Sequence, residues 1–296
     1  MNAHVVDMGV HQKGSFLAAK LFTEIELADL GTCEYRDYVL EDGTSVLAVE
    51  VLTSEPQLSC KYSFIAFYPL GKVGDICMIG SGPGRALARV KEDYCFHDGS
   101  TFKDDADFAV ICVQGPVLPD EAMAEKVAKD CGITADHVFF LAHNNTCITA
   151  SVQVAARIVE QTLPKIMEQT DYPEFVDSIQ FSKGFCLVAP VTEDDDEAMG
   201  KINDSLLYGG RIQFWVDSED EIIEAILPKV ITHSSKTYGK LFKDMYLEAD
   251  RDYFKIDVDV HCPAEVEIFN IRTGNIFKAG GIREDIILKS FFKNKR

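Results

Sequence analysis

The stretch TCITASVQVAARIVE, residues 146–160, holds strong helix formers, neither glycine nor proline, and mostly apolar or small side chains. This composition predicts a helix. At about 100° per residue, its larger polar side chains fall in one narrow stripe, while the rest of the circumference is suited to burial. The stripe consists of Thr146, Thr149, Gln153, Arg157 and Glu160.

Two interpretations of this stripe are open. The simpler one is a surface helix whose solvent side carries the polar residues. The other is a helix buried nearly all round, with one polar line facing a pocket. Arg157 and Glu160 stand three residues apart, within hydrogen-bonding reach of each other. In the second interpretation Glu160 is a candidate general base that its arginine neighbour keeps ionised.

The composition is that of a folded globular protein. Of its 296 residues, 47% are hydrophobic and 10% aromatic, which argues against disorder and allows one large or two ordinary domains. The formal net charge of −19 disfavours nucleic acid and anionic membrane surfaces as partners. No apolar run is long enough to span a membrane, and no signal-peptide pattern follows Met1, so we expect a cytoplasmic protein.

The cysteines indicate reduced thiols rather than a disulfide framework or a metal site. Nine of them are spread along the chain without a CxxC pair, at positions 33, 60, 77, 95, 112, 131, 147, 186 and 262. The seven histidines include no HExxH motif, and His261–Cys262 is an isolated pair. We therefore predict no metal ligands.

Strands and helices are predicted to alternate irregularly, which favours an α+β fold over a doubly wound sheet. We expect strands in the N-terminal third, over 5–10, 15–30 and 34–52, with a hairpin turn at Asp42–Gly43. Further on, we expect helices over 118–132 with Pro119 in its first turn, from 146 to about 168, and over 193–207, 234–254 and 283–293. Two short strands are expected around Gly184, and a hairpin over 264–280 turning at Thr273–Gly274.

Two further stretches are candidates for chemistry. GSGPGRAL, residues 80–87, places three glycines and a proline between a strand and a helix. Such a turn is either an anion cradle of backbone N–H groups or simply a tight structural turn. The acids of residues 193–197 either favour the start of a helix through its dipole or line a cleft. In the cleft interpretation Asp195, Asp196 and Asn203 are the candidate contacts.

Six strings, in order along the chain, resemble methenyltetrahydromethanopterin cyclohydrolases. They are IGSGPGRALA, DDADFAVICV, LPDEAMAEKVAKDCG, SVQVAARIVE, APVTEDDDEAMGKINDSLLYGG and DYFKIDVDVHCPAEVEIFNIRTGNIFKAG. The resemblance implies a cytoplasmic homotrimeric hydrolase of one-carbon metabolism, found in methanogenesis and methylotrophy. It implies two mixed α/β-type domains with the active-site pocket between them, no tightly bound cofactor and no metal. We expect residues 1–83 with about 178–296 to form the first domain, and about 84–177 the second.

The resemblance also implies the reaction, which is hydrolysis of the cationic methenyl bridge of 5,10-methenyltetrahydromethanopterin to a formyl group. The family's Arg-x-x-Glu pair falls on Arg157 and Glu160, which the stripe had already singled out. Glu160 is then the general base for water, and Arg157 tunes it. The implied substrate contacts are Thr149, Gln153, Ser81, Gly82, Pro83, Asp195, Asp196 and Asn203.

The chain departs from the family pattern in three places. The family's N-terminal helical segment is expected to be absent, because the pattern begins almost at Met8. His143–Cys147 replaces a small, proline-containing string, and Phe181–Cys186 replaces a stretch rich in glycine and alanine. These changes keep two alternatives open, a paralogue that acts on another pterin one-carbon carrier and a pterin-binding protein without catalysis. A purely structural trimer is a third.

Overall fold

The structure is a computed structural model that describes residues 2–73, 76–96 and 102–292. The chain forms two compact units, and each is made from two separate stretches of sequence. Unit 1 consists of residues 1–31 and 58–150, and unit 2 of residues 32–57 and 151–296. Each unit has its own mixed sheet with helices, which confirms the α+β class and the two-domain organisation.

The bounds of these units differ from the expected domain limits near residues 83 and 177 because strands far apart in sequence share a sheet. The early strand β3 (Ser45–Thr53) pairs antiparallel with β8 (Ile179–Leu187), as the expected first domain requires. Residues 4–9 pair instead with residues 139–143, and residues 80–81 with residues 112–113, so both segments belong with the stretch expected in the second domain. Sequence periodicity predicts strands but not which distant strand each one pairs with.

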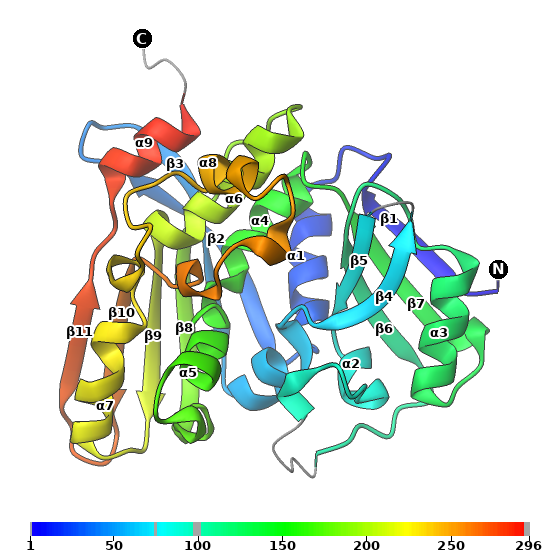
Figure 1. Ribbon diagram of the computed structural model, residues 1–296, viewed down its shortest axis with the longest axis horizontal. Helices are drawn as coiled ribbons and strands as arrows, with labels where there is room; N and C mark the ends of the chain where they lie inside the picture. The colour runs from blue at the N-terminus through cyan, green and yellow to red at the C-terminus, as the bar shows by residue number, and fades with distance from the viewer. Residues whose placement is uncertain (1, 74–75, 97–101, 293–296) are drawn as a thin grey trace. The chain divides into compact units, whose positions relative to one another are not determined.

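Unit 1 holds a five-stranded sheet in the order β1-β7-β6-β5-β4, in which β1, β7 and β6 run parallel (Figure 1). Its strands are β1 (His4–Gly9), β4 (Tyr68–Val73), β5 (Ile76–Ser81), β6 (Ala109–Gln114) and β7 (Val138–His143). Its helices are α1 (Phe16–Glu26), α2 (Gly84–Ala88) and α3 (Glu121–Cys131), with a π-helical segment over Gln57–Phe64 and 3₁₀ turns at Tyr94–Phe96 and Ala135–His137.

Both faces of the unit 1 sheet are apolar. Ile111 and Phe140 pack with Val127 of α3 on one face, whereas Cys112 and Leu141 pack with Phe22 of α1 on the other. Successive residues of β6 and β7 thus point to opposite faces, each covered by its own helix (Figure 1). This explains why the two strands read as continuous apolar runs.

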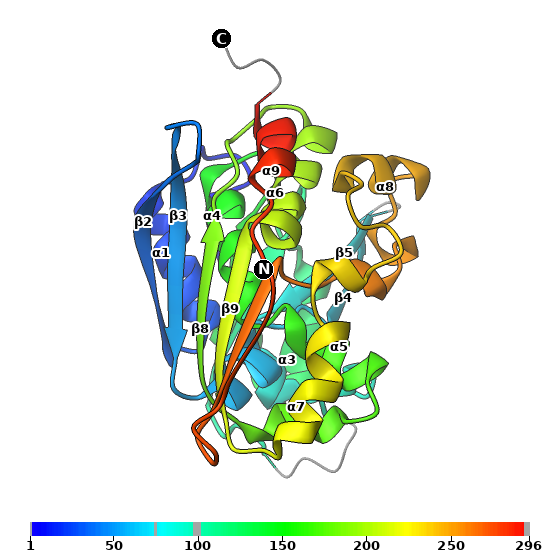
Figure 2. The ribbon, with the colours of Figure 1, turned by 90° about the vertical axis from the view of Figure 1, so that its left-hand side faces the viewer.

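Unit 2 holds a six-stranded mixed sheet in the order β11-β10-β9-β8-β3-β2, and Figure 2 shows β2, β3, β8 and β9 side by side. The strands not yet given are β2 (Gly31–Val39), β9 (Gly210–Val216), β10 (Glu265–Asn270) and β11 (Ile276–Gly280). Its helices are α5 (Thr162–Gln169), α6 (Asp195–Gly209), α7 (Asp220–Ile226), α8 (Phe242–Glu248) and α9 (Glu284–Phe291). Short 3₁₀ segments lie at Arg157–Val159, Pro173–Ser178, Leu227–Lys229, Thr232–Ser234, Tyr253–Lys255 and Val258–Val260.

Helix α4 (Ile148–Ala156) begins in unit 1 and ends in unit 2. Within unit 2, α5, α6 and α7 lie on the same side of the sheet (Figures 1 and 2). The opposite face of that sheet carries both aromatic and charged residues, such as Phe185, Trp215 and Lys183. No helix among the described residues is both long and apolar enough to cross a membrane.

Several predicted elements are confirmed. The hairpin turns at Gly43 and Gly274 both have positive φ, +84° and +78°, as these turns require. Gly132 ends α3 with a φ of +71°. The last helix and the helix after Asp194 lie within two residues of their expected bounds.

Other predictions were wrong. Residues 16–26 form a helix rather than a strand, because Ser15 caps it by accepting a hydrogen bond from Ala18 N at 3.0 Å. In α3 the N-cap is Asp120, so Pro119 lies before the helix. Residues around Gly184 form one strand instead of two. Of the helix expected over 234–254, only Phe242–Glu248 is α-helical.

Candidate functional site

Helix α4 is buried nearly all round, its polar stripe included. Thr149 and Gln153 are fully buried, so the surface-helix interpretation is wrong. The Thr149 hydroxyl donates a hydrogen bond to the carbonyl of Met8 in unit 1, at 2.6 Å. Thr146 lies before the helix, where its N–H donates to Asn144 Oδ1 at 2.9 Å. The stripe is therefore shorter than the sequence suggests.

The predicted long helix changes form at Arg157. A 3₁₀ turn over Arg157–Val159 separates α4 from α5, and the backbone N–H groups of Glu160 and Gln161 both donate to the carbonyl of Arg157, at 2.9 Å each. Pro164 lies inside the first turn of α5, where proline costs little. The expected helix to about residue 168 is thus two helices joined by a tight turn, and the Arg–Glu pair lies in the turn.

Arg157 links two other polar side chains, Glu160 and Gln153, into one chain of hydrogen bonds. Its Nη1 donates to Glu160 Oε1 at 3.1 Å, and its Nε donates to Gln153 Oε1 at 3.1 Å. Both members of the ion pair are mostly screened from water, with side chains 13% and 8% exposed. A carboxylate fixed in this way by a guanidinium group is oriented and electrostatically stabilised, as a general base requires.

Two glycines allow this turn to approach the sheet of unit 2. A Cβ on Gly184 of β8 would lie 2.3 Å from Ile158 Cγ2, and one on Gly210 of β9 would lie 2.4 Å from Ile158 Cδ1. Both distances are far below van der Waals contact, so only glycine permits this packing. Ile158 is fully buried as a result, and the two strands fix the position of its neighbours Arg157 and Glu160.

Tyr253 lies close enough to the pair for the charges of Arg157 and Glu160 both to affect its pKa. Burial raises the pKa of Tyr253, and the Glu160 carboxylate adds to the rise while the Arg157 guanidinium opposes it. Its ring centroid is 5.4 Å from that of His261 and 6.0 Å from that of Phe242. The phenol is therefore protonated at neutral pH.

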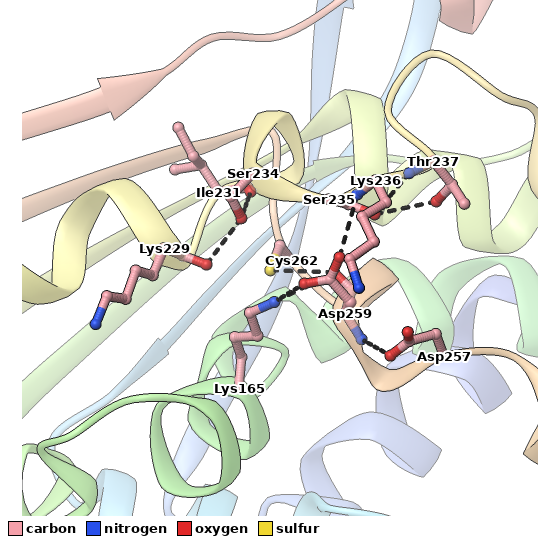
Figure 3. Close-up of polar contacts among 10 residues, drawn as sticks. All are labelled: Lys165, Lys229, Ile231, Ser234, Ser235, Lys236, Thr237, Asp257, Asp259 and Cys262. Atoms are coloured by element: carbon pink, nitrogen blue, oxygen red, sulfur yellow. Dashed lines mark hydrogen bonds and ion pairs between the residues drawn. The ribbon is translucent and has the colours of Figure 1, made fainter.

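A second polar cluster fixes the segment that follows Tyr253. The buried ammonium of Lys165 in α5 pairs with the carboxylate of Asp259, which also accepts a hydrogen bond from Lys236 N at 3.2 Å (Figure 3). Burial would raise the pKa of Asp259, but these contacts outweigh it and lower the pKa. Burial, helped by the Lys165 charge, lowers the pKa of His261 to about 4, so its imidazole is neutral at neutral pH.

The GSGP turn in unit 1 is bonded to its own surroundings. Gly82, with φ +99°, donates its N–H to the carbonyl of Ser63 at 2.8 Å. The Ser81 hydroxyl donates to the buried carboxylate of Glu26. After Pro83, α2 is only five residues long. A carboxylate beside the turn and a short helix favour the structural interpretation over an anion cradle.

Arg85, the residue that closes this turn, is also structural. Its guanidinium lies fully buried and donates to both oxygens of Asp93, at 2.8 and 2.9 Å. It also donates to the carbonyl of Ser63 at 3.1 Å. A paired and hydrogen-bonded charge of this kind fixes the loop around it.

The acidic segment begins α6, as the dipole explanation predicts. Asp194 caps the helix by accepting from Glu197 N at 2.8 Å. Asp196 accepts two hydrogen bonds from Arg251, at 2.9 and 2.8 Å, and these lower the pKa of Asp196. Asp195 is exposed, and the amide of Asn203 donates to Met199 O of the same helix at 2.9 Å. The structure does not gather these three side chains into one group.

Lys183 points away from the Arg157–Glu160 turn. Within β8, Gly184 faces Ile158, so Lys183 lies on the opposite face of the sheet. Its ammonium pairs with Glu50 Oε2 at 2.9 Å. This cation therefore lies on the face of the sheet away from the Arg157–Glu160 pair.

Two hollows in unit 2 are lined by residues other than the candidate pair. One, of about 240 Å³, lies among Thr232, His233, Tyr238 and the segment 280–283, and the other, of about 600 Å³, among Tyr38, Phe185, Arg211 and the start of α9. Neither hollow includes Arg157 or Glu160, so neither belongs to the candidate pair.

Sequence reasoning missed the two glycines, Tyr253 and the Lys165–Asp259 cluster. The segment 252–262 was quoted only for its resemblance, and its aromatic and charged residues carry no helical or strand periodicity. The one usable signal was Gly184, placed between two predicted short strands, because a glycine within extended chain often marks a close approach of another backbone.

Comparison with known proteins places the chain in one family. The family model described as "Cyclohydrolase (MCH)" matches residues 1–291. The chain is 34% identical over 292 residues to the methenyltetrahydromethanopterin cyclohydrolase of Methanothermobacter marburgensis, covering 97% of this chain and 89% of that protein.

Two further proteins of the same name are similar to an equal extent. The one from Methanocaldococcus jannaschii is 34% identical over 296 residues, and the one from Methanococcus maripaludis strain C5 is 36% identical over 290 residues. Each match covers 97% of this chain and 88% of the relative.

Proposed function

Because this chain belongs to the Cyclohydrolase (MCH) family, we propose that it is an enzyme that hydrolyses the methenyl bridge of 5,10-methenyltetrahydromethanopterin to the formyl pterin. The observation that carries the residue assignment is the buried ion pair of Arg157 and Glu160, with Nη1 and Oε1 3.1 Å apart. Glu160 is the general base, and Arg157 orients its carboxylate and stabilises the charged form. Its biological setting is one-carbon metabolism, in methanogenesis or methylotrophy.

The proposed chemistry needs few protein groups. The methenyl carbon lies between two nitrogens and shares their positive charge, so it is already electrophilic. Glu160 takes a proton from water as the oxygen bonds to this carbon, which gives a neutral hydroxylated bridge. One carbon–nitrogen bond then breaks, and the departing nitrogen takes the proton that Glu160 carries. The hydroxyl group loses its proton to solvent as the carbon becomes a formyl group. Positioning and one general base supply several kcal/mol in such a reaction.

The buried surroundings of the pair support this role. Gln153 holds Arg157 Nε at 3.1 Å, so the guanidinium is fixed from two sides. The cationic substrate carbon favours an ionised carboxylate beside it. The neutral phenol of Tyr253 lies in the field of the pair and adds no net charge.

The substrate contacts remain part of the proposal. Gln153 is the best supported, because it lies in the chain of hydrogen bonds with the catalytic pair. Thr149, Ser81, Gly82, Pro83, Asp195, Asp196 and Asn203 are proposed as pterin contacts on the strength of the family resemblance. We also propose a homotrimer in the cytoplasm with no tightly bound cofactor, since the substrate itself carries the reactive carbon.

The second candidate is a paralogue that acts on another pterin carrier or binds a pterin without catalysis. It is favoured by the segment His143–Cys147, which departs from the family string and forms the link into α4. Lys183, which lies in the second departing segment Phe181–Cys186, pairs with Glu50 on the far face of the sheet and so gives this alternative no support.

The deciding experiment mixes the purified chain with 5,10-methenyltetrahydromethanopterin and follows the loss of the methenyl chromophore. We expect loss far above the rate in buffer alone, with formyl pterin as the product. A rate equal to that in buffer alone, together with retained pterin binding, would contradict the enzyme proposal and support a pterin-binding protein without catalysis.

A further inference from the structure

One face of the unit 2 sheet is built as three rows that cross the strands. Hydrogen-bonded partners in a sheet share a face, so the strand register defines each row. We call the thirteen residues of these rows on β3, β8, β9, β10 and β11 the open face: Glu50, Leu52, Phe181, Lys183, Phe185, Arg211, Gln213, Trp215, Glu265, Glu267, Phe269, Ile276 and Lys278.

The first row is apolar across four strands. Phe181 pairs with Trp215, Trp215 with Phe269, and Phe269 with Ile276. The rings of Trp215 and Phe269 stack with centroids 4.9 Å apart. Phe181 is 47% exposed and Ile276 66% exposed, and Leu52 at the far edge of the next row is 42% exposed. Trp215 and Phe269 between the two exposed ends are half-buried. A contiguous apolar row that reaches solvent in this way marks an interaction surface.

The other two rows carry charges that are paired within the face. Lys183 Nζ lies 2.9 Å from Glu50 Oε2, and Lys278 Nζ lies 2.9 Å from Glu265 and 3.0 Å from Glu267. Gln213 donates to Glu267 at 2.6 Å. Three basic and three acidic side chains give the open face a formal charge of zero.

We infer that the open face is the surface through which this chain associates with a second copy of itself. The chain as a whole carries a formal charge of −19, so two copies repel each other over most of their surfaces. The open face is neutral and its charges already have partners, so bringing it against another copy costs little repulsion. Aromatic residues and arginine are also the types enriched in protein interfaces.

The area of the open face is large enough to form the centre of a protein interface. Five strands about 4.8 Å apart and rows about 13 Å deep give roughly 500 Å² once side-chain widths are included. A standard interface buries about 800 Å² on each partner, so the open face supplies its centre. The inference rests on the proposed assembly for the number of copies but is independent of the proposed reaction.

Helix α1 in unit 1 offers a rival surface, which the experiment must separate from the open face. Phe16, Leu17 and Leu21 of α1 are 54%, 66% and 45% exposed. Three double variants therefore carry the same added charge of −2 each. They are Ile276→Glu with Phe181→Glu on the open face, Leu17→Glu with Leu21→Glu on α1, and Val39→Glu with Phe108→Glu as the control. The control positions are matched in exposure, at 62% and 49%.

The mass of each protein is measured by light scattering at fixed physiological salt. We expect wild type and control to share one assembled mass, and the open-face variant to show the single-chain mass of 32.9 kDa. The inference is overturned if the open-face variant keeps the wild-type mass, if the control also dissociates, or if wild type itself is a single chain. Dissociation of the α1 variant alone would show that the copies associate through α1 and not through the open face.

Trp215 is the only tryptophan of the chain and reports directly on the open face. Acrylamide should quench its fluorescence several-fold less in wild type than in the single variant Ile276→Glu, because assembly covers the ring. Equal quenching in the two proteins counts against the interface. The methenyl assay separates the two proposals. An active single chain overturns the interface alone, and an inactive assembly overturns the reaction alone.

Discussion

Gly184 of β8 lies directly against Ile158, so that a Cβ on this glycine would stand 2.3 Å from Ile158 Cγ2. Ile158 is one of the two residues between Arg157 and Glu160, in the turn that joins α4 to α5. The absence of a side chain at position 184 therefore sets the position of the candidate catalytic pair. A strand residue with no chemistry of its own controls the geometry of the base.

Gly184→Ala should consequently lower activity by at least tenfold, because the turn must move away from the sheet. Overpacking of this kind also costs about 1–3 kcal/mol of the free energy of unfolding. Turnover and urea denaturation are the measurements. Gly281→Ala is the matched control, since a Cβ there meets nothing within 4 Å. Adding Ile158→Leu, which lacks the Cγ2 branch that the new Cβ would meet, should restore part of both losses. No recovery would mean that another contact positions the turn.

Glu160→Gln tests the base directly. The amide is close in shape to the carboxylate and keeps an oxygen that can accept from Arg157 Nη1, so folding and pterin binding should change little. Because an amide cannot take a proton from water, we expect kcat to fall on the order of a hundredfold to ten-thousandfold. Turnover within a few-fold of wild type would show that another group, or no group, acts as the base.

The two arginine variants separate charge from geometry. Arg157 uses Nη1 for Glu160 and Nε for Gln153, and only a guanidinium can span both acceptors. Arg157→Lys keeps the charge but loses the fork, so its kcat should lie between those of wild type and Arg157→Ala. Steady-state kinetics of the three proteins give the order. A lysine variant as slow as the alanine variant would mean that the fork geometry, rather than charge, is what Glu160 needs.

Local chemistry explains why some of the fold was predictable. A turn is predicted at Asp42–Gly43 and at Thr273–Gly274 because glycine adopts a positive φ without strain. Both hairpins were predicted correctly. The helix expected over 234–254 failed for a tertiary reason. Gly239 has a φ of +88°, and Asp250 and Arg251 also have positive φ, which breaks the amphipathic pattern into turns.

The candidate site was likewise predictable where its contacts are local in sequence and unpredictable where they are not. Helical spacing put Arg157 and Glu160 within reach of each other, and the structure joins them at 3.1 Å. The spacing also predicted a continuous helix, which was wrong, because the 3₁₀ turn depends on strands that follow later in the chain. Tyr253 lies 93 residues beyond Glu160 in sequence, and no periodicity links them. Such contacts are decided by tertiary packing.

Asp204 gives a prediction about the pH dependence of stability. It lies buried in α6, where its carboxylate accepts from Ser290 Oγ at 2.6 Å and from Phe242 N at 2.9 Å, and so joins α6 to α8 and α9. Burial raises the pKa of Asp204 to about 7, although both hydrogen bonds oppose the rise. The folded state therefore keeps this proton at pH values where the unfolded chain has lost it.

The sign follows from proton linkage. Between the unfolded pKa near 4 and the folded pKa, the folded state binds more protons, so the contribution of Asp204 to stability falls as pH rises. Three pKa units correspond to roughly 4 kcal/mol as an upper limit. Asp204→Asn, which cannot titrate, should lose this dependence. Urea denaturation of both proteins at several pH values from 5 to 8 measures it. We expect the stability of wild type relative to Asp204→Asn to decrease steadily over that range. A constant difference, or one that grows with pH, would show that the Asp204 carboxyl is ionised in the folded protein throughout.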